Sequence, residues 1–142
     1  MSNFRPPVVT VDAIPQVALD SMNHTHQEEV ELINRFAELL VADSPDEGAI
    51  TTLFDEWLEH TRDHFDRENR LMQEYDFPAY PVHSGEHERV LAQLESLRQE
   101  WYQNKQVEPV ANFIFVDWPA WFDQHVNSMD MVTAQFISHK VA

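Results

Sequence analysis

The sequence predicts an all-α fold, an up-down-up-down antiparallel four-helix bundle that follows an extended N-terminal arm. Apolar residues recur at steps of three and four along four successive stretches, which is typical of helices with one buried face. Only two glycines occur among the 142 residues, too few for a β protein rich in turns. A chain of this length fits one domain, and we expect an arm over residues 1–19 and a bundle over residues 20–142.

The N-terminal arm contains three prolines, whereas the predicted first helix contains none. Pro6, Pro7 and Pro15 favour extended chain up to residue 19. The first helix is predicted over residues 21–43. Its buried stripe consists of Met22, His26, Val30, Ile33, Phe36 and Leu40.

The second helix is predicted over residues 45–75. The segment Ser44-Pro45-Asp46-Glu47 matches a capping box, with Ser44 as the N-cap and Pro45 in the first helical position. The two prolines within residues 76–81 predict the turn that follows this helix. The buried stripe of the helix consists of Leu53, Trp57, Thr61, His64, Glu68, Leu71 and Tyr75.

The third and fourth helices are predicted over residues 82–103 and 108–137. The third carries the stripe His83, His87, Val90, Leu94, Leu97 and Trp101. Pro119 lies inside the fourth helix, where it removes a backbone donor and crowds the preceding turn. We therefore expect a kink or a break near Asp117.

The composition excludes several classes of function. The net charge of −16 disfavours nucleic acid and anionic membrane surfaces as partners. The absence of cysteine excludes disulfides, thiolate metal sites and a cysteine nucleophile. The N-terminal residues lack the apolar run of a signal peptide, so we expect a cytoplasmic protein.

Histidines and acids fall on the stripes that should face the core. A single histidine on such a stripe is most often a hydrogen-bonded core residue. Two residues four apart, however, lie about 6 Å from each other on one face of a helix, and both His64/Glu68 and His83/His87 have this spacing. Buried carboxylates are costly unless they are paired or bind a metal, and no lysine or arginine occupies a matching inward position.

The number of donors favours two metal ions. Five histidines are too many for one tetrahedral zinc. If two carboxylates each bridge a metal pair, and the histidines divide three and two, one ion has six ligands when a solvent oxygen also bridges. The other then has five, which leaves one position for a small molecule. The candidate ligands are His26, His64, Glu68, His83, His87, His125 and Asp130.

These residues resemble the hemerythrin family in kind and order. The matching segments are MNHTHQEEVELIN around His26, HFDRENRLM with His64 and Glu68, HSGEH with His83 and His87, and HVNSMD with His125 and Asp130. The resemblance implies a non-haem centre of two iron ions bridged by oxo or hydroxo. It assigns His83, His87 and His125 to the six-coordinate iron, His26 and His64 to the five-coordinate iron, and Glu68 and Asp130 to both.

The resemblance implies reversible binding of O2, or of another small diatomic ligand, for storage, delivery or sensing. One alternative is a di-iron enzyme that reduces O2, peroxide or nitric oxide, or a protein that handles iron. Another is a helical interaction module with a structural metal, against which the open coordination position argues. The family relation makes a non-enzymatic binder the leading hypothesis, and protein partners stay undefined.

Several neighbours of the candidate ligands have two interpretations. His60 is a boundary residue or an outer contact of the site. Phe65, Trp121 and Phe122 are core residues that also line a ligand pocket. Asp123, where the family often has leucine, either faces solvent or makes that pocket more polar. His24 and His139 are expected at the surface, and the arm lacks the tryptophan found in many bacterial members.

The HxxxxD spacing is inconsistent with a regular helix. Five residues at 100° each place Asp130 about 140° away from His125. A local widening of the helix, such as a π-bulge, or an approach of Asp130 from the flank would bring both to the same metals.

Overall fold

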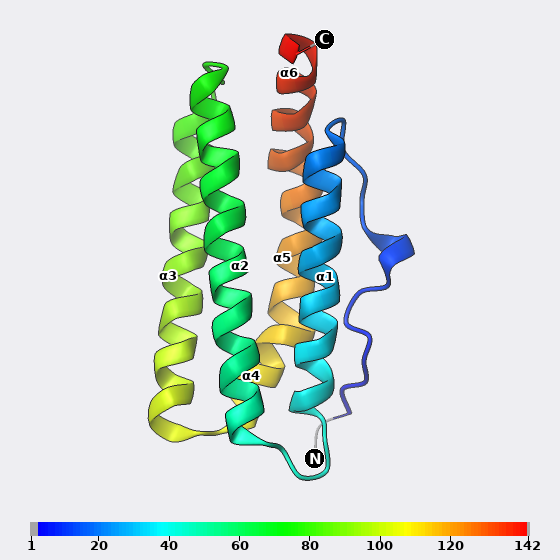
Figure 1. Ribbon diagram of the computed structural model, residues 1–142, viewed down its shortest axis with the longest axis vertical. Coiled ribbons are helices and arrows are strands. Elements are labelled where there is room, and N and C mark those ends of the chain that lie inside the picture. The colour runs from blue at the N-terminus through cyan, green and yellow to red at the C-terminus, as the bar shows by residue number, and fades with distance from the viewer. Residues whose placement is uncertain (1–2, 142) are drawn as a thin grey trace.

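The computed structural model describes residues 3–141, and every regular element in that range is helical (Figure 1). Four antiparallel helical columns form a bundle, as predicted. Three of them are α1 (Asp20–Leu40), α2 (Glu47–Glu74) and α3 (Tyr80–Asn104). The fourth runs without a break through α4 (Val107–Asn112), the π-helical η2 (Phe113–Asp117), α5 (Trp118–His125), the π-helical η3 (Val126–Asp130) and α6 (Met131–Val141).

The helices close into a ring around a shared core. α1 packs against α2, α2 against α3, α3 against α4, and α4 against α1. The predicted stripe of α1 is buried from Met22 to Leu40. One half of the bundle is filled by the apolar side chains Phe36, Phe54, Trp57 and Trp101, and the other half contains the histidines.

The N-terminal arm is extended except for one short 3₁₀ turn, Val11–Ala13, and it lies along α1 (Figure 1). Two asparagines of α1 hold it by pairing with its backbone. Asn34 Oδ1 accepts from the amide of Val8 (2.7 Å), and Asn34 Nδ2 donates to the carbonyl of Val9 (2.8 Å). Asn23 pairs in the same way with both backbone groups of Val17.

The predicted N-cap of the second helix is wrong. α2 begins at Glu47, and the Asp46 carboxylate accepts from the amide of Ala49 (3.0 Å). Ser44 and Pro45 therefore lie before the helix. An aspartate satisfies the free amides of the first turn and also interacts favourably with the positive end of the helix dipole.

Replacing the N-cap should have a measurable cost. Asp46→Ala should lower the free energy of unfolding by about 1 kcal/mol, or roughly 2–4 °C in melting temperature. Ser44→Ala is the matched control and should have little effect. Chemical unfolding of the metal-loaded protein measures both, and a larger loss for Ser44→Ala would restore Ser44 as the cap.

The predicted distortion near Asp117 takes the form of a π-helical segment. η2 ends at Asp117, and Pro119 occupies the first turn of α5. The wider turn accommodates the proline without ending the helix, so the fourth column is distorted here but not broken.

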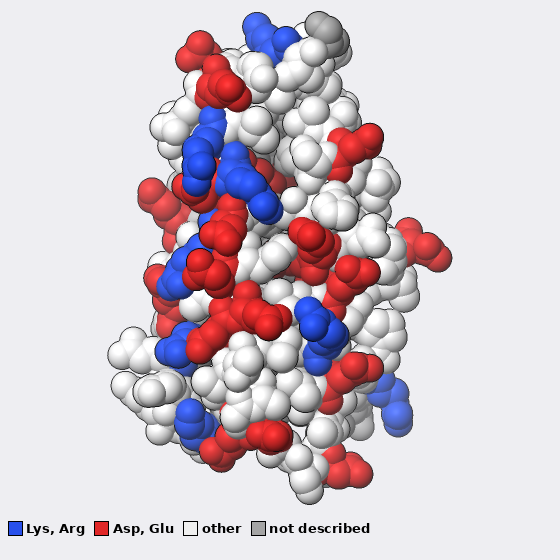
Figure 2. All heavy atoms as spheres, in the orientation of Figure 1, with Lys and Arg blue, Asp and Glu red and all other residues white. Residues whose placement is uncertain are grey.

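The surface is acidic, with scattered basic side chains on the face shown in Figure 2. Some of these form ion pairs between helices, for example Arg62 of α2 with Glu95 of α3 (2.6 Å). Both side chains are largely exposed, so the pair adds little stability. None of the helices in residues 3–141 combines the length and apolarity needed to span a membrane.

Candidate metal centre

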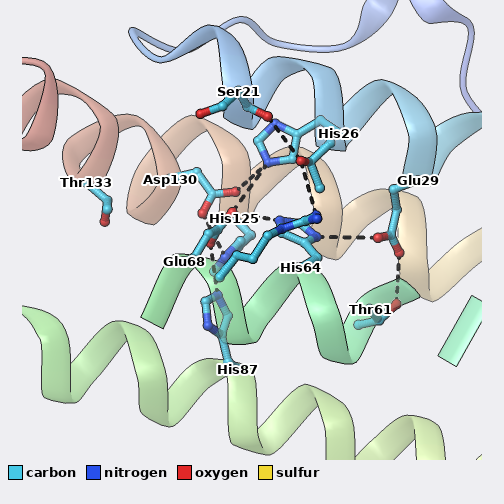
Figure 3. A network of polar contacts seen from close by, with 12 residues as sticks. Ser21, His26, Glu29, Thr61, His64, Glu68, His87, His125, Asp130 and Thr133 are labelled. Carbon is cyan, nitrogen blue, oxygen red and sulfur yellow. Dashed lines mark hydrogen bonds and ion pairs between the residues drawn. The ribbon is translucent and has the colours of Figure 1, made fainter. Parts of the chain in front are cut away.

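All four columns of the bundle contribute to one buried cluster of imidazoles and carboxylates (Figure 3). Each of the seven candidate ligands predicted from the sequence is at most 6% exposed. They are His26 of α1, His64 and Glu68 of α2, His83 and His87 of α3, His125 of α5 and Asp130 of η3.

The cluster divides into two groups of potential ligand atoms. The first group consists of Glu68, His83, His87, His125 and Asp130, and the second of His26, His64 and Glu68. Within each group the potential ligand atoms all lie within 4.8 Å of one another. The first group thus has three imidazoles and the second has two.

In each carboxylate, one oxygen faces imidazoles of the first group and the other oxygen faces imidazoles of the second group. Glu68 Oε2 lies 2.6 Å from Nε2 of His64, and its Oε1 lies 3.3 Å from Nε2 of His87. Asp130 Oδ2 lies 3.0 Å from Nε2 of His26, and its Oδ1 lies 3.2 Å from Nε2 of His125. Two carboxylates oriented in this way have the arrangement that bridging of two cations requires.

A π-helical segment brings Asp130 to the cluster. η3 begins directly after His125 and ends at Asp130, so the five-residue spacing spans one widened turn. The local widening is one of the two distortions that the sequence predicts. It reduces the angular separation of about 140° that a regular helix would impose.

The outward nitrogens of two imidazoles are held by neutral groups. His83 Nδ1 donates to Thr133 Oγ1 (2.8 Å), and His87 Nδ1 donates to Asn69 Oδ1 (2.8 Å). Each contact holds its ring with Nε2 directed at the cluster, the nitrogen through which the ring would bind a metal. Sequence reasoning missed Thr133 and Asn69, because such contacts depend on how neighbouring helices meet.

The cluster fits a metal better than it fits hydrogen bonding alone. Several of its buried polar atoms have no hydrogen-bond partner, namely both ring nitrogens of His26, Oε1 of Glu68, Nε2 of His87 and both carboxylate oxygens of Asp130. Unpaired buried groups each cost about 1–3 kcal/mol. Imidazole nitrogen with carboxylate oxygen is a donor set suited to iron or zinc. Among the buried residues of the described chain there is no lysine or arginine to neutralise the acids.

Electrostatics within the cluster favour a proton on His64 when no metal is bound. Burial alone would lower the pKa of His64, but the charge of Glu68 and a hydrogen bond to Glu29 raise it to about 10. Burial would likewise raise the pKa of Asp130, yet the neighbouring imidazoles, His125 first among them, hold it well below its ordinary value. The proton on His64 supplies part of the positive charge that a cation would bring.

Metal binding near neutral pH should therefore release about one proton from His64, because a ligating nitrogen must be deprotonated. The apparent affinity should rise by up to about tenfold per pH unit between pH 6.5 and 10. Calorimetric titration of metal-free protein with a divalent ion, in buffers of different ionisation enthalpy, measures the proton. A binding enthalpy and affinity independent of buffer and pH would contradict this.

The proton on His64 stabilises the metal-free fold, so the stability of that fold should fall with rising pH while the affinity for metal rises. Because the folded-state pKa of His64 lies above its ordinary value of 6.5, the charged form contributes its full stabilisation below about pH 6.5. That contribution is lost as the pH rises through 10.

The aromatic candidates surround the cluster. Phe65 stacks on His87 at 4.0 Å between ring centroids, and Trp121 stacks on His125 at 4.6 Å. Phe122 meets His26 edge-on at 5.6 Å. Together with Trp118, Phe65, Trp121 and Phe122 line a small, mostly enclosed cavity that reaches His64 and His125.

His60 does not line this cavity. It lies at the boundary with solvent, and its Nδ1 donates to Glu29 Oε1 (3.0 Å). Glu29 in turn contacts His64 and lines the cavity (Figure 3). Glu29 could not be singled out from the sequence, although it lies one turn after His26, because the acidic run around it is typical of a solvent-facing surface.

Three other polar residues considered in the sequence lie at the surface. The side chain of His24 is 75% exposed and pairs with Glu28. His139 is exposed near the end of α6. Asp123 is exposed and accepts from Asn127 Nδ2 (3.2 Å), so it does not make the cavity polar.

A second, wider pocket of about 560 Å³ opens between α1 and α2. It reaches His64 and Glu68 from solvent, and its walls include Arg67 and Thr25. The smaller group of donors therefore lies beside both an enclosed cavity and an open pocket.

Comparisons with known proteins agree with this site. Residues 17–137 match the family model described as the hemerythrin HHE cation binding domain. The chain is 33% identical to the bacteriohemerythrin of Aquifex aeolicus (strain VF5), over 80% of this chain and 86% of that protein. It is 30% identical to the bacteriohemerythrin of Ralstonia nicotianae (strain ATCC BAA-1114 / GMI1000), over 70% and 71%. No solved structure matches the chain significantly. With a buried histidine and carboxylate cluster inside the matched segment, the chain belongs to the hemerythrin family of cation-binding proteins.

Proposed function

We propose that this protein holds two iron ions, bridged by oxo or hydroxo, and binds O2 reversibly for storage, delivery or sensing. His83, His87 and His125 would hold one ion, and His26 and His64 the other. Glu68 and Asp130 would bridge them. The observation that carries the proposal is the unequal division of imidazoles, three and two, around carboxylates that face both groups. The ion with fewer histidines would thereby have a coordination position left for an external ligand.

The enclosed cavity beside that position measures about 10 Å³, roughly the space of one water-sized molecule, so only a very small ligand fits there without rearrangement. Phe65, Trp118 and Phe122 are buried and surround the approach to His64. A reduced iron pair, when bound, supplies the electrons that hold O2. The aromatic side chains exclude water and the protons it carries, which should slow irreversible oxidation of the loaded protein.

Optical spectroscopy with metal analysis tests this function. We expect two iron ions per chain, a new visible band when the anaerobically reduced protein meets air, and loss of that band when O2 is removed. Release of peroxide with a spectrum that does not recover would indicate an oxidase. An iron-loaded protein whose spectrum does not change when O2 is added would indicate a structural metal. Either of these two results would overturn the proposal.

The open pocket favours a second candidate, a di-iron enzyme that reduces O2, peroxide or nitric oxide, or a protein that handles iron. A pocket of about 560 Å³ that reaches Glu68 and His64 would admit a reductant or a hydrated ion larger than a diatomic gas. Continuous consumption of O2 or peroxide in the presence of a soluble reductant distinguishes this candidate. A carrier should show one stoichiometric uptake and no turnover.

A further inference from the structure

One buried acid lies outside the seven candidate ligands. Among residues 3–141 the buried carboxylates are Glu68, Asp130 and Glu29. Glu29 is 3% exposed and lies on α1, facing α2. A buried carboxylate that is neither bridging nor paired with a lysine or arginine must be stabilised in another way.

Four donors surround the Glu29 carboxylate. Oε2 accepts from Trp57 Nε1 (2.8 Å) and Thr61 Oγ1 (3.1 Å). Oε1 accepts from His60 Nδ1 (3.0 Å) and, at 3.4 Å, from His64 Nδ1. Burial alone would raise the pKa of Glu29, but the hydrogen bonds from the two histidines hold it well below its ordinary value. Glu29 is therefore a fixed anion directed at the outer edge of His64.

Three other imidazoles of the cluster have a neutral outer partner or none. His83 and His87 donate to a neutral hydroxyl and a neutral amide, respectively. Nδ1 of His26 has no hydrogen-bond partner. A carboxylate on the outer nitrogen fixes the tautomer and makes the inner nitrogen more basic than a neutral partner does.

We propose that Glu29 is a positioning residue that holds His64 with Nε2 directed at the smaller group of donors and strengthens it as a ligand. This inference rests on the proposed two-ion function. The contact with Glu29 makes His64 a more basic ligand. The ion held by two histidines is thereby compensated in part for the lack of a third imidazole. Trp57 and Thr61 fix the carboxylate, and His60 shields it from solvent.

The test compares Glu29→Gln and Glu29→Leu with Glu31→Gln, an exposed acid on the same helix. Full-length metal-free proteins are titrated with Co2+ and followed by its visible bands. In Glu29→Gln the weaker-bound ion should lose about 10–100-fold in affinity, while the tighter-bound ion changes little. Glu29→Leu should lose at least as much, and Glu31→Gln should bind both ions as the unchanged protein does.

A second readout needs no variant. In the Zn2+-loaded unchanged protein, imidazole nitrogen NMR should show the proton of His64 on Nδ1 and the metal on Nε2. Glutamine has the shape of glutamate without its charge, so Glu29→Gln should shift this proton signal, whereas a role in packing alone would not. Thr61→Val removes one donor to the carboxylate and should weaken the second ion less than Glu29→Gln does.

Two results overturn the inference while the two-ion proposal stands. One is a Glu29→Gln protein whose affinity is unchanged for both ions, or is lowered equally for both. The other is a His64 proton on Nε2 in the Zn2+-loaded unchanged protein. Uptake of fewer than two Co2+ ions by the unchanged protein would defeat the two-ion proposal and the inference with it.

Discussion

Metal removal should lower the melting temperature of this protein by roughly 10–20 °C. An ion that binds only the folded chain adds about 2.7 kcal/mol at a concentration of 100 Kd, and two ions add about twice that, which converts at about 2–4 °C per kcal/mol for a chain near this size. The physical reason is that both ring nitrogens of His26 and both oxygens of Asp130 have no hydrogen-bond partner in the core, so removal of the metal leaves them poorly satisfied.

Calorimetry or circular dichroism of chelator-treated and iron-reloaded samples measures this change. Reloading should restore the original melting temperature, which excludes damage during chelation. Because the metal competes with a proton on His64, the stabilisation by metal should shrink as the pH falls from about 10 towards 6.5. Equal melting temperatures for metal-free and loaded protein would contradict a metal centre in the core.

Glu68→Ala should remove binding of both ions. Glu68 is the one residue shared by the two groups of potential ligand atoms, and each of its oxygens faces a different group. Its loss should cost each ion more than the about 10–100-fold typical of an outer partner. His87→Ala, by contrast, should weaken chiefly the ion of the first group, since His87 belongs to that group alone.

Metal content after dialysis at a fixed concentration of free iron measures these differences. Asp63→Asn is a suitable control, because Asp63 is an exposed acid on the same helix. Loss of only one ion in Glu68→Ala would show that Glu68 is a terminal ligand of one metal and does not bridge.

The sequence predicts the bundle well because its stripes are long and regular. Every position of the first stripe, from Met22 to Leu40, is buried in α1. The ends of helices are harder to place, since Ser44 and Asp46 both have side chains that cap. Only the backbone geometry at Asp46 decides between them.

The cluster could be located from spacing on separate helices, because a bundle forces inward positions to converge. The widened turn at Asp130 was also accessible, since the HxxxxD spacing is inconsistent with a regular helix. The role of Glu29 could not be predicted from the sequence, because it depends on contacts with Trp57, Thr61 and His60 of another helix. Such contacts follow from how α1 and α2 pack, which periodicity does not specify.

Anomalous X-ray scattering at the iron edge, from crystals of the iron-loaded protein, would locate the metal ions themselves. Two iron peaks should lie between Glu68 and Asp130, one beside His83, His87 and His125 and the other beside His26 and His64. A single peak, or iron bound outside the four helices, would contradict the proposed two-ion centre.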